Sequence, residues 1–131
     1  MTRYIEIPGL IRDDPVGNTF WIEGISRDDA RIVAWEVNGA WYFSHLFVSP
    51  SFRGRGLAGQ LLDCLCDAAD RAGRVVETVI DPSGPRPRPT VTFLRSFYGR
   101  RGFVKADRAV SFEWAVAPER IIVRQPKDGA A

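Results

Sequence analysis

The most constraining feature of the sequence is a change of hydrophobic period at Pro50. Before it, Ala40–Val48 is long and rich in aromatic residues, which is typical of a strand. After it, apolar residues recur at helical spacing, at Leu57, Ala58, Leu61, Leu62, Leu65 and Ala69. Gly73 supplies a stop for this helix, and Arg74–Ile80 is again apolar and β-branched. A strand, a helix and a strand in this order predict a right-handed crossover between two parallel strands.

The segments around the crossover predict antiparallel strands. Thr19–Ile25 and Arg31–Val37 have strand composition, and Asn38-Gly39 is a strong hairpin signal because both turn positions need positive φ. Further along, we expect an exposed loop over Asp81–Pro89, a helix over Val91–Arg100 capped by Thr90 and ended by Gly102, and closing strands at Val110–Ala115 and Ile121–Arg124. The predicted class is α+β (or α/β), with a mixed, mostly antiparallel twisted sheet, a central parallel pair and two main helices. One domain, residues 1–124, would precede a flexible tail over residues 125–131.

Composition narrows the possible functions. The 131 residues suffice for one core, and 45% apolar with 26% charged residues is an ordinary globular balance. A net charge of +2 does not by itself indicate a nucleic-acid binder. We find no apolar run that could span a bilayer and no secretory signal at the start, so we expect a cytoplasmic, soluble protein without membrane contacts. Cys64 and Cys66 are expected to be reduced thiols, and with His45 as the single histidine no metal site is expected.

The turn between the third strand and the first helix is rich in glycine and arginine. Gly54, Gly56 and Gly59 let the backbone approach a bulky diphosphate, while Arg53 and Arg55 add positive charge. A helix N-terminus with its unpaired N–H groups binds anions at such a turn. The spacing differs from that of a P-loop and from that of a dinucleotide-binding turn.

Two blocks of the sequence resemble the GNAT superfamily of N-acetyltransferases. Arg53-x-x-Gly56-x-Ala58, preceded by Val48-x-Pro50, is similar to the family's pyrophosphate loop, and residues 97–103 (FYGRRGF) are similar to its tyrosine-bearing helix. The resemblance implies acetyl-CoA as co-substrate, held where the two parallel strands splay apart. It also implies that main-chain N–H groups near Leu46 or Phe47 polarise the thioester and that Tyr98 protonates the departing thiolate. The cofactor-binding residues expected on this basis are Leu46, Phe47, Val48, Arg53, Gly54, Arg55, Gly56, Leu57, Ala58, Gly59 and Arg101.

The sequence departs from the family at the position of the general base. Where some members carry a glutamate on the third strand, this chain has Tyr42. Candidate bases elsewhere are His45, Glu36, Glu77 and Asp81; a water chain, or no base for an amine that arrives neutral, are the alternatives. We name His45 with Tyr98 as the catalytic pair, and Glu36, Tyr42 and Asp81 as candidate substrate-binding residues.

A second departure lies at the N-terminus. Only Gly9–Phe20 separates a strand expected at Tyr4–Ile7 from the next one, so the family's usual pair of covering helices cannot fit. The acceptor side should then be open, or closed by another subunit or by the Asp81–Pro89 loop. We expect aromatic surface at Phe20, Trp21 and Trp41–Phe43, which a second copy of the chain or a macromolecular acceptor would cover. In the alternative, strand alternation turns Trp41 and Phe43 into the core with Tyr42 outward, and nothing needs covering.

The leading function is transfer of an acyl group, expected to be acetyl, directly from acetyl-CoA to an amine. The acceptor could be a protein, a small amine or a base in nucleic acid, and the arginines at 86, 88, 95, 100 and 101 could attract a phosphate-bearing one. A non-catalytic CoA-binding module and an enzyme that modifies nucleic acid are the alternatives.

Overall fold

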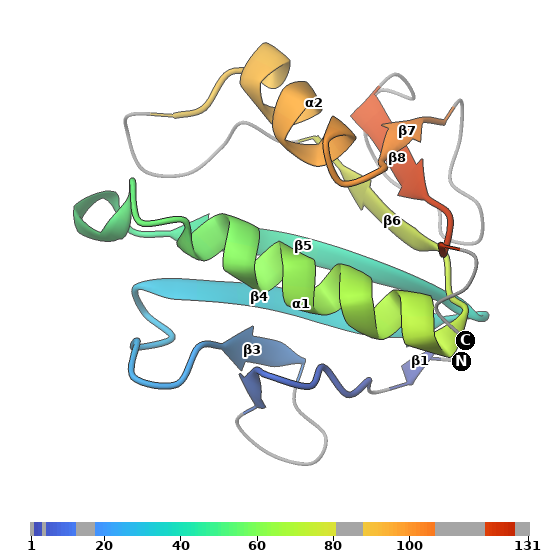
Figure 1. The fold of residues 1–131 in the computed structure, drawn as a ribbon, viewed down its shortest axis with the longest axis horizontal. Helices are drawn as coiled ribbons and strands as arrows, with labels where there is room; N and C mark the ends of the chain where they lie inside the picture. The colour runs from blue at the N-terminus through green and yellow to red at the C-terminus, as the bar shows by residue number, and fades with distance from the viewer. Residues whose placement is uncertain (1, 4, 13–17, 81–87, 107–119, 128–131) are drawn as a thin grey trace.

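The computed structural model describes residues 2–3, 5–12, 18–80, 88–106 and 120–127. Within these ranges the strands form one mixed sheet in the order β2-β3-β4-β5-β6-β8-β7, with β1 paired to β4 (Figure 1). The strands are β1 Thr2–Arg3, β2 Ile11–Arg12, β3 Thr19–Trp21, β4 Ala30–Val37, β5 Ala40–Val48, β6 Val76–Val79, β7 Val104–Lys105 and β8 Ile121–Arg124. The helices are η1 Pro50–Phe52, α1 Leu57–Ala72 and α2 Val91–Gly99. The predicted fold class is confirmed.

The antiparallel meander is present, but its first strand is shorter than predicted: β3 ends at Trp21, and Ile22–Ile25 lies outside the strands. β3, β4 and β5 are successive antiparallel neighbours, and the β4–β5 turn has positive φ at both Asn38 (53°) and Gly39 (85°). Thr90 caps α2 by accepting a hydrogen bond from the Phe93 N–H at 3.0 Å. The expected strand at Val110–Ala115, the loop at 81–87 and the end of the tail lie outside the described residues.

The parallel pair is short, and its strands then separate. β5 and β6 are in register only at Trp41↔Val76 and Tyr42↔Glu77, although β5 continues to Val48. Figure 1 shows the two strands diverging toward the end where α1 begins. Beyond the last pair, the buried Thr78 hydroxyl donates to the Phe43 carbonyl at 2.7 Å. The splayed strands that the resemblance implied are therefore present.

Helix α1 lies across β4 and β5 and covers one face of the sheet (Figure 1). The residues it buries share one side of the helix: Leu57, Leu61, Leu62, Leu65, Cys66, Ala68 and Ala69. Gly73, with φ 66°, ends the helix as predicted. Both cysteines are free thiols, and burial raises the pKa of Cys66 to about 12. No helix in the described part of the chain is long and apolar enough to cross a membrane.

The first strand is not where the sequence suggested. The expected strand at Tyr4–Ile7 is wrong: β1 covers Thr2–Arg3, and Ile5–Ile7 lies outside the strands, although Ile5 and Ile7 are buried in the core. The reason is that β1 and β3 pair with different parts of the same edge of β4. β1 pairs with its end at Glu36–Val37, and β3 pairs with Ile32–Val33, so the chain between them must leave the edge. The described residues of Gly9–Phe20 hold β2 and the start of β3, and no helix.

The aromatic residues of β5 are covered within the chain. Trp41 and Phe43 lie in the core under the helices, as the alternative interpretation predicted. Tyr42 points to the opposite face but is also fully buried, with its ring centroid 6.4 Å from that of Trp35. The expected exposed surface at Trp41–Phe43 is therefore wrong, and the homodimer that it motivated stays a prediction.

Candidate functional site

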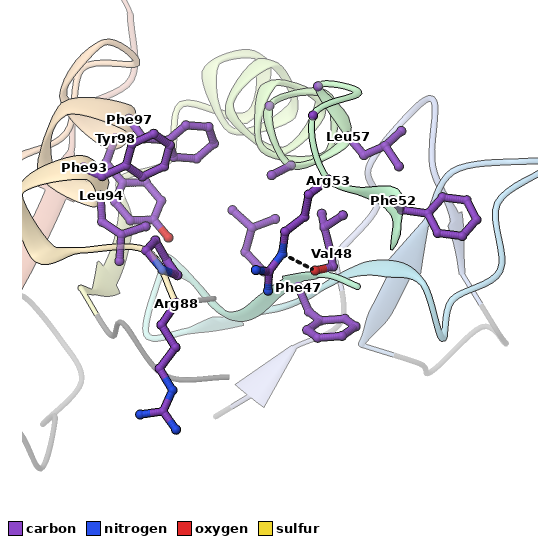
Figure 2. A pocket seen from close by; sticks show the side chains of 16 residues that line it. Phe47, Val48, Phe52, Arg53, Leu57, Arg88, Phe93, Leu94, Phe97 and Tyr98 are labelled. Atoms are coloured by element: carbon purple, nitrogen blue, oxygen red, sulfur yellow. Dashed lines mark hydrogen bonds between the residues drawn. The ribbon is translucent and has the colours of Figure 1, made fainter. Parts of the chain in front are cut away.

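A cavity of about 510 Å³ opens between the end of β5, the start of α1 and one side of α2. Figure 2 shows α2 side chains facing those of the η1–α1 turn across it. Its walls come from four segments: Leu46–Val48 of β5, Phe52–Gly59 without Arg55, the pair Arg88–Pro89, and Phe93, Leu94, Phe97 and Tyr98 of α2. Most of these side chains are apolar, and the charged ones are Arg53 and Arg88, so the cavity suits a ligand with an apolar stretch and an anionic group.

The anionic end of such a ligand would meet the turn that begins α1. Gly54 and Gly56 have φ of 82° and 75°, a region that favours glycine, and Gly56 is the N-cap. No side chain caps this helix, so the first N–H groups of α1 open onto the cavity. Arg53 also lines the cavity, and its Nε donates to the Val48 carbonyl at 3.1 Å (Figure 2). This is the geometry that the glycine-rich sequence predicted.

Gly59 and Arg101 have a different relationship from the one expected. A Cβ atom on Gly59 would lie 2.7 Å from Nη2 of Arg101. Arg101 donates from Nε to Asp63 at 2.8 Å and from Nη1 to the Phe97 carbonyl at 3.0 Å, and its guanidinium lies 4.4 Å from the Phe97 ring centroid. It joins α1 to α2 and is not among the described residues that line the cavity. Arg55, exposed and stacked 4.7 Å from the Phe52 ring, does not line it either.

Tyr98 lines the cavity from α2, on the side where α2 contacts β5. It is buried among aromatic rings, 5.9 Å from the centroid of Phe43, 5.4 Å from Phe97 and 5.7 Å from Phe103. These contacts fix the ring, which lines the cavity with Leu46 and Phe47. The predicted acid thus stands beside the segment of β5 where the thioester was expected.

Strand β5 has a bulge between Ser44 and Phe47, next to Tyr98 and the cavity. Arg31 pairs with Phe47 and Val33 with Ser44, so β5 contains one residue more than β4 across this interval. His45 lies in the bulge with φ 50°, a conformation that side-chain-bearing residues rarely adopt. The bulge interrupts the ladder next to Leu46, which is where a backbone N–H was expected to face the ligand.

Of the remaining candidate residues, Glu36, Tyr42 and Glu77 do not line the cavity. Glu36 accepts a hydrogen bond from Trp41 Nε1 at 3.0 Å. Its partner Trp41 lies about 16 Å along β5 from Leu46 at ~3.3 Å per residue, so the structure does not bring Glu36 to the cavity. Tyr42 and Glu77 are paired in register and fully buried, on the sheet face opposite the helices. Asp81 lies outside the described residues.

Sequence reasoning missed part of the cavity wall. Phe93, Leu94 and Phe97 line it from α2, and the rings of Phe93 and Phe97 stack with centroids 6.2 Å apart. The signal available was the spacing of these two phenylalanines, which puts them one turn apart on the helix. In the described part of the chain, no three His, Cys, Asp or Glu side chains gather as a metal site would require.

The chain is similar to known proteins in sequence and in fold. Residues 17–105 match the acetyltransferase (GNAT) domain. Over 117 residues the chain is 35% identical to the L-2,4-diaminobutyric acid acetyltransferase of Streptomyces coelicolor, covering 84% of this chain and 59% of the relative. The chain therefore spans less than two thirds of that relative's length.

Solved structures share the fold. A GNAT family N-acetyltransferase from Escherichia coli, in complex with CoA, has a TM-score of 0.57 at 21% identity, covering 86% of this chain and 59% of that one. An acyl-CoA N-acyltransferase from Pseudomonas aeruginosa has a TM-score of 0.53 at 23% identity, covering 86% and 70%. At these identities the likeness concerns the fold alone.

Proposed function

The chain belongs to the GNAT acetyltransferase family, and from this membership we propose that it transfers an acetyl group from acetyl-CoA to an amine. The observation that carries the proposal is the cavity of about 510 Å³ that joins the uncapped start of α1 to Tyr98. One end of this cavity offers backbone N–H groups to a diphosphate, and the other offers a phenol to a leaving thiolate.

The cofactor would lie with its pyrophosphate on the turn Arg53–Gly59 and its pantetheine along the splayed end of β5. The apolar walls from β5 and α2 suit the pantetheine arm, and the β5–β6 register does not extend to Leu46 and Phe47, so β6 does not pair with their backbone groups. Arg53 would add charge beside the diphosphate. The roles of Arg55 and Arg101 in cofactor binding stay predictions, since both guanidinium groups are stacked on rings here.

In the reaction, the amine nitrogen attacks the thioester carbon, the C–S bond breaks, and Tyr98 donates its proton to the thiolate. A thiol of ordinary pKa about 8.5 and a phenol of about 10 are close enough for this transfer. A backbone N–H at the β5 bulge would polarise the thioester carbonyl, as a preorganised donor does in acyl transfer.

The acceptor is proposed as an amine without further identity. The relative from Streptomyces coelicolor carries a diamino acid in its name, which makes L-2,4-diaminobutyrate the first amine to test. Protein and nucleic-acid acceptors, the homodimer and the cytoplasmic location remain predictions from the sequence.

The test is turnover of acetyl-CoA by the purified protein with L-2,4-diaminobutyrate, polyamines, peptides and single-stranded nucleic acid. The release of free thiol measures the rate, and mass spectrometry identifies the acetylated product. Acetylation of any amine above the rate without protein supports the proposal. Tight binding of CoA without turnover of any acceptor would instead support the non-catalytic alternative.

A further inference from the structure

Ser44 and His45 are sequence neighbours in β5 whose side chains contact each other. The Ser44 Oγ and the His45 Nδ1 are 2.9 Å apart. In a regular strand, neighbouring side chains project to opposite faces and cannot meet in this way. The bulge and the positive φ of His45 turn its ring onto the side of Ser44. A non-glycine residue in this conformation is strained, and the surrounding structure must offset that strain.

The pair lies on the face of β5 opposite to Tyr98. Phe43, immediately before Ser44, points into the core and contacts the Tyr98 ring. By alternation, Ser44 points to the other face, where it pairs in register with Val33. Leu46, immediately after the bulge, lines the cavity. The Ser44–His45 pair and Tyr98 therefore flank the same short segment of backbone from its two sides.

The two side chains differ in their access to water. Ser44 is half-buried, whereas His45 is exposed. A proton received by the inner hydroxyl can therefore pass to the imidazole and leave to solvent without crossing the core. No comparable path starts from Glu77, which is fully buried, or from Glu36, which is held by Trp41 at the far end of β5.

We propose that Ser44 and His45 together remove the proton from the amine, with Ser44 as the residue that meets the acceptor. This inference rests on the proposed acetyl transfer. As the new C–N bond forms and the C–S bond breaks, the nitrogen loses one proton to Ser44 Oγ. The hydroxyl proton of Ser44 moves to Nδ1 of His45, and the imidazolium releases a proton to solvent. The thiolate takes its proton from Tyr98, and the phenolate then regains one from solvent. The proton released on the Ser44 face is therefore balanced by one taken up on the Tyr98 face.

The arrangement assigns the acceptor to the face of the sheet away from the helices. The cavity lies on the side of α1 and α2, so a ligand that fills it leaves the thioester open to attack only from the opposite side. Ser44 is on that side, two residues along β5 from the buried Tyr42.

The experiment compares Ser44→Ala, Ser44→Thr and His45→Gln with the wild type, using acetyl-CoA and the best amine from the panel. We expect kcat to fall about 100-fold in Ser44→Ala and His45→Gln, with little change in KM for acetyl-CoA, because a general base contributes about that factor. Ser44→Thr keeps the hydroxyl and should restore most of kcat. The double variant should be no slower than the slower single one, and Ser96→Ala, an exposed serine on α2 outside the cavity wall, is the matched control.

A second measurement needs no turnover. His45 is the only histidine in the chain, so the imidazole ¹⁵N signals are assigned without ambiguity. Ser44→Ala should change the Nδ1 signal and the balance of the two tautomers. Identical imidazole signals in the two proteins overturn the inference. An unchanged kcat in Ser44→Ala, or an acetyl group trapped on Ser44, also overturns it while the proposed function stands. A wild type that acetylates no amine removes the proposed function and this inference with it.

Discussion

Arg124, the last residue of β8, forms two hydrogen bonds with Asp70 near the end of α1, Nη1 to Oδ1 at 2.7 Å and Nη2 to Oδ2 at 3.0 Å. The side chains are only 3% and 10% exposed. Asp70 also accepts from the Lys127 N–H at 2.9 Å.

Asp70→Ala would leave the arginine buried without its carboxylate, and we expect the free energy of unfolding to fall by about 3 kcal/mol. Urea unfolding measures this, with the exposed Asp67→Ala as the control. A loss no larger than that of the control would contradict it.

The same ion pair predicts acid sensitivity. The hydrogen bond from Arg124 lowers the pKa of Asp70 in the folded protein below its ordinary value of 3.8. The unfolded chain therefore binds this proton first as the pH falls, and the stabilisation, fully present above pH about 4, is lost below it. The difference in unfolding free energy between wild type and Asp70→Asn should be constant from pH 7 to 5 and shrink below pH 4. A difference that persists unchanged at pH 2 would exclude this origin.

The conformation of Gly56 allows a clean test of the anion site. Its φ of 75° strains any side chain, but a Cβ there meets no atom within 4 Å, so the fold should survive substitution. Gly56→Ala and Gly56→Asp share that strain, whereas only the second adds a negative charge where the diphosphate would lie. We expect Gly56→Asp to bind acetyl-CoA at least about 10-fold more weakly than Gly56→Ala, a difference of ~1.4 kcal/mol in calorimetry. Equal affinities would place the diphosphate elsewhere.

The aromatic contacts of Tyr98 make Tyr98→Phe a conservative change. Phenylalanine keeps the packing against Phe43, Phe97 and Phe103 and loses only the hydroxyl. Acetyl-CoA affinity should therefore be retained, while kcat falls about 100- to 10,000-fold because the leaving thiolate has no acid. Steady-state kinetics with a calorimetric binding measurement separates the two quantities. If kcat is unchanged, Tyr98 is a core aromatic residue and another group protonates the thiolate.

Local signals account for what could be predicted from the sequence. The Asn38-Gly39 turn, the Thr90 cap, the stop at Gly73 and the Gly56 turn depend on one or two residues each, and all four appear where expected. The residues of the candidate anion site lie within one such turn, which is why the sequence could propose them together.

The features that were missed depend on contacts between distant segments. Whether Ile5 joins a strand is decided by how β1 and β3 share the edge of β4, which its own sequence does not encode. Asp70 has the spacing of a solvent-facing helix residue, and only the position of β8 gives it Arg124 as a partner. The bulge at His45 is equally hidden, because a histidine at positive φ has no distinctive neighbour in the sequence.

The contact between Gly59 and Arg101 gives the last prediction. Alanine at position 59 should favour the helix by up to about 1 kcal/mol, since glycine is the poorer helix former. Its Cβ, however, would stand 2.7 Å from Arg101 Nη2 and push the guanidinium away from Asp63 and the Phe97 carbonyl. In the wild-type background these effects oppose each other, so Gly59→Ala should change stability little or reduce it. In an Arg101→Ala background only the first remains, and the same substitution should stabilise by about 1 kcal/mol. Urea unfolding of the four proteins measures the coupling between the two positions. Equal effects of Gly59→Ala in both backgrounds would show that the Arg101 guanidinium does not oppose a side chain at position 59.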